Sequence, residues 1–416
     1  MSTVGTQERT PYSVGPRSAQ ATVGGGTVVR LGQVLRRFNV IVHPGDRESG
    51  HATFVGLEHI EPGTGRRVGS ATVNFATMTG RKPTFRRGQI IYGYLRPYLN
   101  KVWIAEFDGC SSVDQFAFEV DETRANPQFL AAFLRSETFL SRAAKVTTPG
   151  QLPRISIEEI ESVELGLPAL PEQERIAARL TKQLAAVDRA RAAAQSRLAA
   201  ARALPAAYLR EALEGLDTGT VELRHISRAV TDGTHLPPPF ISRGIPFLFV
   251  RNIVAGRIDF NVQKYVSEAS YAQLTQKYHA ERGDLLFSAV GSFGVAVVVD
   301  TDERFVFQRH IAHIKPDPEK VDSHFLAMFL NSARGRAQSE AVALGCAQRT
   351  VTLKELRRFI IPLPSLTEQR RIASDLSRRL SEAERLVGRT WEELAAIEAL
   401  PAALLREAFG EGGRDE

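Results

Sequence analysis

Residues Leu167 to Leu213 decide the fold, because the chain contains this stretch twice. The first copy reads LPALPEQERIAARLTKQLAAVDRARAAAQSRLAAARALPAAYLREAL, and Leu363 to Phe409 reads LPSLTEQRRIASDLSRRLSEAERLVGRTWEELAAIEALPAALLREAF. The copies start 196 residues apart and align over 47 residues without a gap, with 23 identities. A match of this length, with Leu-Pro near both ends of each copy, indicates an internal duplication.

Each copy is predicted to be one long helix. Pro171 occupies the position of a first helical residue, and in the second copy Ser365 and Glu368 have the spacing of a capping box. Apolar positions recur in alternating steps of four and three from Leu376 to Ile397, and the first copy keeps this register from Leu180 to Ala201. This heptad seam favours an antiparallel pair of helices. The alternative is two amphipathic helices, each packed only on its own neighbouring domain.

Two features interrupt the helical pattern. Arg191 puts a charge on the seam, where it would either loosen the middle of the helix pair or form a salt bridge across it. Pro205 and Pro401 cannot donate a backbone hydrogen bond, so both helices are predicted to break there and to continue as short helical tails.

The regions between the copies are predicted to be mixed domains. Each has short strand-like segments followed by amphipathic helical sequence, at residues 126–146 and 323–340. The duplication extends into them, because Phe129 and Phe133 recur as Phe325 and Phe329. The predicted division is a disordered tail (1–27), a first domain (28–166), a central helix (167–214), a second domain (215–362) and a C-terminal helix with tail (363–416). The fold class is α+β: two mixed α/β domains separated by two long antiparallel coiled-coil helices, with a pseudo-two-fold internal repeat.

Composition is that of an ordinary soluble protein, with 43% hydrophobic and 24% charged residues. Cys110 and Cys346 lie far apart without metal-ligand spacing, so we expect no zinc site, no disulfide framework and a cytoplasmic location. No apolar run reaches the roughly 18 residues that span a bilayer. The net charge of +6 favours an anionic partner only slightly.

The openings LPALPEQERI (167–176) and LPSLTEQRRI (363–372) resemble those of the two spacer helices in the specificity subunit of type I restriction-modification systems. FVGLEHI (54–60), DGTH (232–235) and GIPF (244–247) are similar to recognition-domain sequences of that family. The resemblance covers about residues 28–409. It implies two target recognition domains, each reading one half of a bipartite site in double-stranded DNA, and helices that set their spacing.

The resemblance also implies partners. The helices would dock two methyltransferase subunits, with restriction subunits joining them. The residues that the resemblance assigns to docking are Glu172, Gln173, Ile176, Glu368, Gln369 and Ile372. It implies no cofactor on this chain, and S-adenosylmethionine, ATP and Mg²⁺ on the partner subunits.

Basic residues interleaved with aromatic and amide side chains suit contacts to phosphates and base edges. In the first domain the candidates are Arg81, Lys82, Arg86, Arg87, Tyr94, Arg96, Tyr98 and Lys101. In the second they are Thr234, His235, Arg243, Arg251, Asn252, Lys277, Ser292, Gln308 and Arg309. A third cluster precedes the last strand of each domain and contains Gln151, Arg154, Gln348 and Arg349.

Each cluster has a structural alternative. Residues 81–88 equally suit a solvated charged face, and Arg251-Asn252 equally suits a surface turn. The third cluster either contacts DNA or braces the helix.

Catalytic motifs are missing from the sequence. An adenine methyltransferase needs Asn or Asp before Pro-Pro-aromatic, and the closest string, Leu236 to Phe240, lacks it. No Walker A sequence is present, and the histidines have no nearby nucleophile or metal partner. We therefore expect a non-catalytic DNA-binding module. The alternative is a coiled-coil scaffold whose terminal domains bind other proteins.

Overall fold

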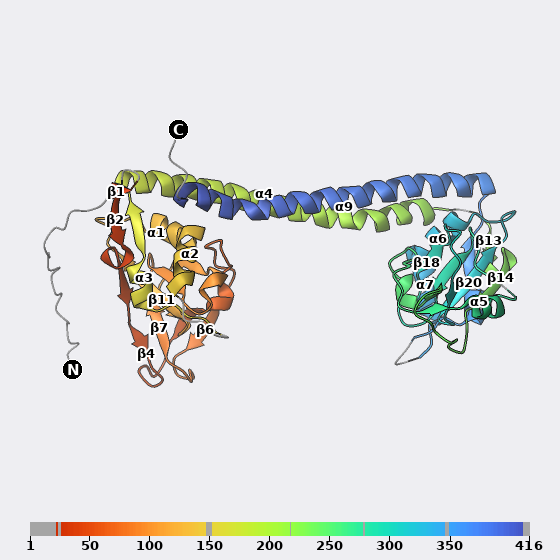
Figure 1. The fold of residues 1–416 in the computed structure, drawn as a ribbon, viewed down its shortest axis with the longest axis horizontal. Coiled ribbons are helices and arrows are strands. Elements are labelled where there is room, and N and C mark those ends of the chain that lie inside the picture. Colours follow the sequence, from red (N-terminus) through yellow and green to blue (C-terminus); the bar gives the residue numbers. More distant parts are fainter. Residues whose placement is uncertain are drawn as a thin grey trace. The chain divides into compact units, whose positions relative to one another are not determined.

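The computed structural model describes residues 22–23, 26–146, 152–216, 218–277, 279–345 and 349–410. These residues form two compact units. The first unit holds the described residues up to Ala194 and those from Glu393 onward, and the second is Gln195–Glu392. Both boundaries fall inside the two long helices, α4 (Leu170–Leu213) and α9 (Leu366–Phe409) (Figure 1). Each unit therefore contains the start of one long helix and the end of the other.

The first unit combines three sheets with three short helices. Its strands are β1 (Thr22–Val23), β2 (Gly26–Arg30), β3 (Leu35–Phe38), β4 (Ile41–Val42), β5 (His51–Val55), β6 (Ala71–Asn74), β7 (Lys82–Phe85), β8 (Ile90–Gly93), β9 (Val102–Ile104), β10 (Gly109–Ser111), β11 (Gln115–Val120) and β12 (Glu164–Leu167). Its helices are α1 (Pro127–Arg135), α2 (Glu137–Val146) and α3 (Ile157–Ser162), with 3₁₀ turns at Leu31–Gln33, Leu57–His59 and Pro97–Leu99. The sheet orders are β1-β2-β12, β4-β7-β10-β5-β6 and β3-β11-β8-β9.

The second unit has the same kind of organisation with fewer strands. Its strands are β13 (Thr220–Glu222), β14 (Ser227–Asp232), β15 (Ile245–Leu248), β16 (Tyr265–Val266), β17 (Leu285–Ser288), β18 (Ala296–Val298), β19 (Val306–Phe307), β20 (Ile311–Pro316) and β21 (Ile360–Pro362). Its helices are α5 (Glu268–Leu274), α6 (Ser323–Asn331), α7 (Ala333–Val342) and α8 (Leu353–Leu356), with 3₁₀ turns at Leu223–His225 and Val250–Asn252. The sheet orders are β13-β21, β14-β20-β17-β18 and β16-β15-β19.

The four-stranded sheets correspond strand by strand. β3-β11-β8-β9 and β14-β20-β17-β18 have antiparallel neighbours throughout, in the same relative sequence order. Each unit also has one parallel pair, β10 with β5 and β19 with β15. The fold is therefore the predicted α+β duplication, with two mixed domains joined by the long helices.

The long helices pair antiparallel within each unit. In the first unit Arg179 lies 3.5 Å from Glu407. In the second, Arg379 lies 2.7 Å from Glu211, and the Arg202 guanidinium lies 5.5 Å from the centre of the Trp391 ring. The seam positions of both helices are buried or half-buried, as the heptad predicted.

The ends of the helices complete the core of each domain. The first core includes Ile176 and Leu180 from the start of α4 together with Leu405 from the end of α9. The second core includes Leu376 from α9 and Leu213 from α4. Both predicted interactions are thus present, because each helix packs on a domain and on the other helix.

The prediction that Pro205 and Pro401 break the helices is wrong. α4 and α9 each continue through the proline for another two turns. One missing backbone hydrogen bond costs less than losing the packing of these last turns, where Leu213 and Leu405 are almost fully buried.

The single helices predicted at residues 126–146 and 323–340 are each two helices. Ser136 and Ser332 have extended backbone conformations, with ψ of 153° and 168°. Each hydroxyl then accepts a backbone N–H of the following helix, which it caps. A serine inside an apolar pattern was the signal for the break.

Within the described residues of α4 and α9, Arg191 does not form a salt bridge across the helix pair. Its guanidinium lies 3.2 Å from Glu61, in a loop of the first unit, and 3.9 Å from Asp188 on its own helix. Arg66 completes the group, at 3.0 Å from Asp188 and in contact with Glu61. We call these four residues the α4 bracket. They connect the middle of α4 to the first domain.

The predicted polar tail ends before residue 27. Residues 1–21 lie outside the described part of the chain, but Thr22–Val23 pairs with Gly26 and Thr27 as a short hairpin. Among the described residues, no helix is both long and apolar enough to cross a membrane.

Candidate nucleic-acid interface

Tyr94 is the centre of the candidate site in the first unit. It follows β8, and the pairing of β8 with β11 brings its ring onto Phe116, with 4.3 Å between ring centres and 19° between planes. The Tyr94 hydroxyl donates to the Val113 carbonyl at 2.8 Å. Arg37 on β3 lies 5.2 Å from the centre of the Phe116 ring. An aromatic stack with a guanidinium beside it suits contacts to nucleotides.

Three arginines surround the Tyr94 phenol. Burial, assisted by Asp114, raises the pKa of Tyr94, and the nearby charges of Arg154, Arg37 and Arg81 oppose this rise. Three of the residues brought together here, Arg81, Tyr94 and Arg154, were predicted. Arg37 and Phe116 were missed, because only the pairings of β11 with β8 and with β3 place them beside Tyr94.

Strand β7 divides the predicted basic run. Arg81 and Lys82 lie at its start, whereas Arg86 and Arg87 follow its end. The Lys82 ammonium lies 5.1 Å from the Phe54 ring centre, and the Arg86 guanidinium lies 5.1 Å from that of Phe38. The run therefore forms two cationic sites, each partly supported by an aromatic ring.

The loop after β8 presents a rigid aromatic tip. Arg96 (φ 54°) and Asn100 (φ 51°) are the only non-glycine residues with positive φ in the described chain, and they flank the 3₁₀ turn. Tyr98 between them is 63% exposed. Strained backbone of this kind collects at functional sites. Lys101 contradicts the prediction, because its ammonium turns inward and donates to the Leu57 carbonyl.

In the second unit, Gly233 brings two candidate segments together. A Cβ at this position would lie 2.0 Å from the Phe307 carbonyl oxygen, so only glycine permits the approach. Thr234 then forms a strand-like bridge with Gln308, and the Arg309 N–H donates to the Thr234 carbonyl at 3.0 Å. This contact gathers the predicted Thr234, His235, Gln308 and Arg309.

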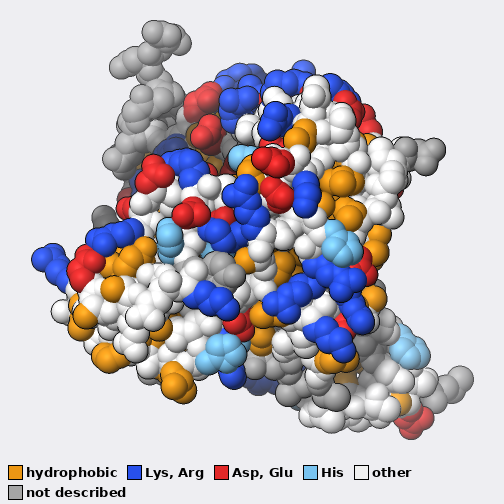
Figure 2. All heavy atoms as spheres, turned by 90° about the vertical axis from the view of Figure 1, so that its right-hand side faces the viewer, with side chains coloured by type: hydrophobic (Ala, Val, Ile, Leu, Met, Phe, Trp, Pro, Cys, Tyr) orange, Lys and Arg blue, Asp and Glu red, His pale blue; other side chains and the backbone are white. Residues whose placement is uncertain are grey.

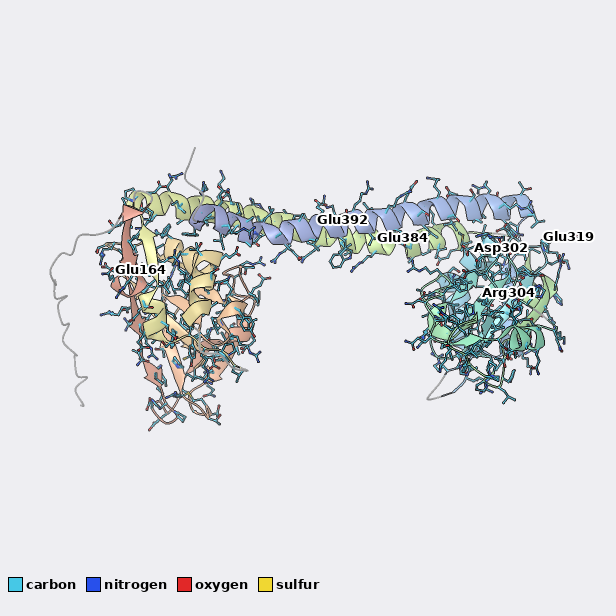
Figure 3. All side chains as sticks on the ribbon, in the orientation of Figure 1. Glu164, Asp302, Arg304, Glu319, Glu384 and Glu392 are labelled. Carbon is cyan, nitrogen blue, oxygen red and sulfur yellow. The ribbon has the colours of Figure 1, made fainter. Side chains whose placement is uncertain are left out.

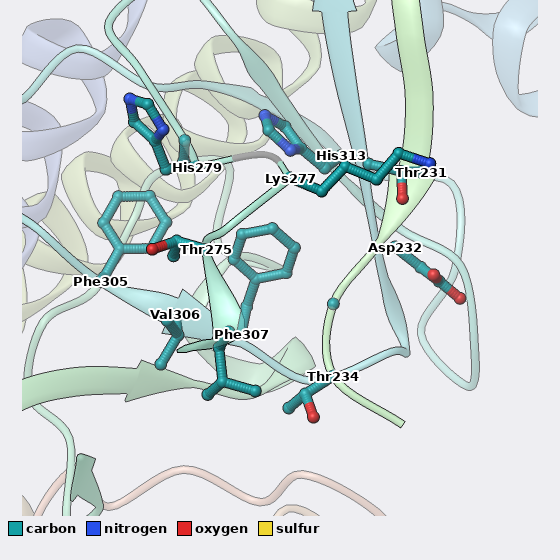
Figure 4. Close-up of a pocket in the computed structure, with 13 residues that line it drawn as sticks. Thr231, Asp232, Thr234, Thr275, Lys277, His279, Phe305, Val306, Phe307 and His313 are labelled. Carbon is teal, nitrogen blue, oxygen red and sulfur yellow. The ribbon is translucent and has the colours of Figure 1, made fainter. Parts of the chain in front are cut away.

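A cavity of about 160 Å³ lies beside this turn (Figure 4). Lys277 and His279 line it, together with the buried His313. The His313 ring lies 2.8 Å from Asp284, whose carboxylate also accepts from the Lys315 ammonium at 2.7 Å. Burial works to raise the pKa of Asp284, but the hydrogen bonds from His313 and Lys315 outweigh it and hold this pKa below its ordinary value.

Most other candidates of the second unit are exposed. These are His235, Arg243, Arg251, Lys277, Ser292 and Arg309. Figure 2 shows Lys and Arg side chains gathering on one face of the structure. Asn252 contradicts the prediction, since it is 2% exposed. Its amide accepts from the Phe249 N–H and donates to the Asp259 carbonyl, so it holds a turn and cannot read a base.

The third predicted cluster does not recur as expected. Arg154 forms a strand-like bridge with Leu95, and the corresponding bridge in the second unit joins Thr350 to Val290. Arg349 is therefore not the counterpart of Arg154. Its guanidinium instead pairs with Glu340 and lies 5.1 Å from the Phe293 ring centre. The other two predicted members, Gln151 and Gln348, lie outside the described residues.

Gln173 and Gln369 have the same internal role in the two units. Each side chain is 0% exposed. The Gln173 oxygen accepts from the Asn126 N–H at 2.9 Å, and its nitrogen donates to the carbonyls of Arg124 and Pro168. Gln369 makes the same three bonds in the second unit. We call these residues the glutamine latches, and they fix the start of each long helix on its domain.

The glutamine latches correct the docking prediction. Their side chains and those of Ile176 and Ile372, each 5% exposed, belong to the domain cores and offer no surface for a partner. Packing inside each domain thus explains the Gln and Ile positions of the two helix openings, residues 167–176 and 363–372. Glu172 and Glu368 do reach solvent, each in an ion pair with an arginine three residues later. The Arg371 guanidinium lowers the pKa of Glu368.

No group of three or more His, Cys, Asp or Glu residues in the described part of the chain is arranged to hold a metal ion. The family model for the type I restriction modification DNA specificity domain matches residues 252–386. The chain is 32% identical to the EcoDI specificity subunit of Escherichia coli over 157 residues, which are 38% of this chain and 35% of that protein. It is 25% identical to the EcoBI specificity subunit of Escherichia coli over 70% of this chain and 66% of that protein.

Solved structures share the whole fold. The HsdS subunit from Thermoanaerobacter tengcongensis matches with a TM-score of 0.67 and 22% identity, over 94% of this chain and 98% of its own. A chain from a study of assembly and conformational transition of the type I R-M system matches with a TM-score of 0.75 and 22% identity, over 94% and 100%. The family match over residues 252–386, these relatives and the shared fold make this chain similar to the specificity subunits of type I restriction-modification systems.

Proposed function

We propose that this chain reads DNA for a type I restriction-modification complex, with each unit recognising one half of a bipartite site. The observation that carries the proposal is the repeated topology on one pair of antiparallel helices. The frameworks match, whereas the loops that bear exposed Arg, Tyr and His side chains differ. A shared topology with different loops suits two domains that bind different DNA half-site sequences.

The exposed cations support DNA as the ligand. Arg86, Arg87, Arg243 and Arg309 are exposed. Side chains of this kind contact phosphates and position a protein on duplex DNA, while neighbouring polar groups read base edges. The other reading, a scaffold for proteins, predicts no dependence of binding on DNA sequence.

We further propose that the chain itself is not catalytic and works in the cytoplasm. Two methyltransferase subunits would dock on the exposed faces of α4 and α9, and restriction subunits would join them. S-adenosylmethionine, ATP and Mg²⁺ would then bind to those partners. Glu172 and Glu368, with their paired arginines, are the predicted docking residues that reach solvent.

The proposal is tested by sequencing the methylome of a host with and without this chain, supplied with candidate methyltransferase subunits. We expect one bipartite motif to gain methylation, and purified chain alone to bind that motif in a gel shift without methylating it. Methylation by the chain alone would reject the non-catalytic assignment. Binding that ignores DNA sequence would favour the scaffold.

Exchange of the first domain tests whether each domain recognises its own half-site independently. Replacing residues 28–166 with the matching domain of a relative should change one half-site and leave the other and the spacer intact. A simultaneous change in both half-sites would contradict independent reading.

The helices are proposed to set the spacer length. Removing residues 192–198 and 391–397 takes one heptad from each helix and leaves the α4 bracket and both latches in place. Seven residues correspond to about 10 Å of helix, or about three base pairs of duplex. We expect the spacer between unchanged half-sites to shorten by one to about three base pairs. An unchanged spacer would mean that the helices do not set it.

A further inference from the structure

Leu236 has the most exposed large apolar side chain in the described part of the chain, with 80% of its surface accessible. Isolated exposed leucines are common and need no explanation by themselves. Leu236 differs from other exposed leucines because three consecutive prolines, Pro237 to Pro239, follow it and restrict the backbone. We call residues 235–239 the proline arch.

The proline arch is stiff and is held at both ends. Proline rings fix the backbone φ, and the Thr234 hydroxyl donates to the Leu236 carbonyl at 2.7 Å. Before the arch, Thr234 is bridged to Gln308. After it, Phe240 packs edge-on against Phe247, with 5.1 Å between ring centres. A side chain held this way loses little conformational entropy on binding.

The surroundings of the arch favour a polyanion. Between Asp232, whose carboxylate lies 3.1 Å from the His235 ring, and Asp259, the sequence contains three arginines and no further Asp or Glu. Two of them, Arg243 and Arg251, are exposed, and the exposed Arg309 lies beside Thr234. An apolar side chain in a segment that is rich in cations fits a ligand with a charged backbone and apolar interior surfaces. Duplex DNA, with phosphates outside and stacked bases inside, has this chemistry.

We propose that the proline arch enters a groove of the half-site read by the second unit and that Leu236 inserts between two adjacent base pairs. This rests on the proposed function, and it adds a way of reading DNA. Apolar wedges partly unstack a base step and kink the duplex, so the sequence at that step matters without any hydrogen bond to it. Burial of the Leu236 side chain offsets part of the cost of unstacking.

The test uses duplexes that carry the methylome-defined site, with 2-aminopurine placed at successive positions of the half-site assigned to the second unit. This base fluoresces more strongly when unstacked. The purified full chain is used without methyltransferase subunits, because those enzymes flip bases themselves. We expect the emission to rise at one base step only.

Leu236→Ala should abolish that rise and weaken specific binding roughly tenfold, the size expected for a leucine side chain no longer buried. The salt dependence should stay the same, because no charge is removed. Leu236→Met should retain both the signal and the affinity. Leu386→Ala, at a leucine on α9 that is 38% exposed, serves as the matched control and should change neither.

Two results would overturn the wedge and leave the proposed function standing. One is specific binding by the unaltered chain without a rise at any position. The other is a rise that survives Leu236→Ala. If the unaltered chain fails to select the methylome-defined duplex at all, the proposed function falls as well.

Discussion

The two units contain the same turn with different buried side chains. Gly88 (φ 87°) and Gly283 (φ 93°) are its third residues, and Gln89 and Asp284 follow, 5% and 6% exposed. In both, the side-chain oxygen accepts the backbone N–H three residues earlier, at 2.8 and 2.9 Å. The first unit uses a neutral amide here, and the second uses a carboxylate within an ionic network. Backbone geometry therefore survived the duplication, while electrostatics diverged.

The long helices show the same contrast. The two glutamine latches make matching bonds, but the α4 bracket has no matching partner on α9. The positions of Asp188 and Arg191 are taken there by Glu384 and Val387. Glu384 is exposed on α9 (Figure 3). The packing, the latches and the Glu172–Arg175 and Glu368–Arg371 ion pairs are thus shared, and the α4 bracket distinguishes the first half.

The largest effects on stability should come from the C-terminal ends of α4 and α9. Each end packs in the core of the domain on which the other long helix starts. Leu405→Ala opens a cavity in the first core, and Leu213→Ala opens one in the second, where these leucines are 3% and 0% exposed. Each should cost about 3 kcal/mol of unfolding free energy. Hydrogen exchange should increase in the first domain for Leu405→Ala and in the second for Leu213→Ala.

Leu400→Ala is the control for this pair, because Leu400 is 43% exposed on the same helix as Leu405. It should change stability by less than about 1 kcal/mol. Loss of protection in the second domain after Leu405→Ala would contradict the assignment of cores.

The latches should give the next largest effects, equal in the two halves. Gln173→Leu or Gln369→Leu removes the hydrogen-bond partner of one backbone N–H and two backbone carbonyls, at a cost of about 2 kcal/mol. Urea unfolding followed by hydrogen exchange should locate the loss at the junction of α1 or α6 with the long helix. Gln195→Leu, at an exposed position of α4, should be neutral. A large effect in only one half would mean that the latches are not equivalent.

Low pH should destabilise the second unit more than the first, because only the second unit has the buried carboxylate of Asp284. Its pKa is lowered in the folded state. The resulting stability is present above the unfolded pKa of about 4 and is lost as pH falls through the lower folded value. Asp284→Asn should cost about 1 to 2 kcal/mol at pH 7 and should flatten the acid side of the stability profile of the second unit.

Asp302→Asn is the control for acidity, since this carboxylate is 84% exposed in its pair with Arg282. It should leave the profile nearly unchanged. An equally steep acid loss in Asp284→Asn would assign the pH dependence to other groups.

The smallest effect should come from the α4 bracket. Arg191→Val copies the residue at the matching position of α9 and should cost less than about 1 kcal/mol, because Glu61 and Asp188 each keep an ion pair with Arg66. The difference from the unaltered chain should disappear in about 1 M salt. Arg189→Val, on the exposed side of the same helix, should show no difference at any salt concentration.

The sequence predicted the duplicated framework, since heptads and ungapped identity report directly on helix packing. Short strands in both domains were also predicted. Side-chain direction was not predictable. Lys101 and Asn252 are residue types that often contact DNA, yet Lys101 donates to the Leu57 carbonyl, 44 residues away in sequence, and Asn252 holds a local turn. Arg37 was missed for the opposite reason, because a strand pairing between distant segments places it beside Phe116.

The shared cores also determine the order in which the chain can finish folding during synthesis. The core of the first domain includes Leu405 from the end of α9, and Leu404 and Phe409 pack against it. Phe409 is synthesised 215 residues after Ala194, the last residue of the first segment of this unit. At roughly 5 to 20 residues per second, the first domain waits about 10 to 45 s for these side chains. During that time the apolar side of α1, including Phe129 and Phe133, lacks its cover from Phe409. We therefore expect the nascent first domain to expose this apolar surface until the last turns of α9 emerge.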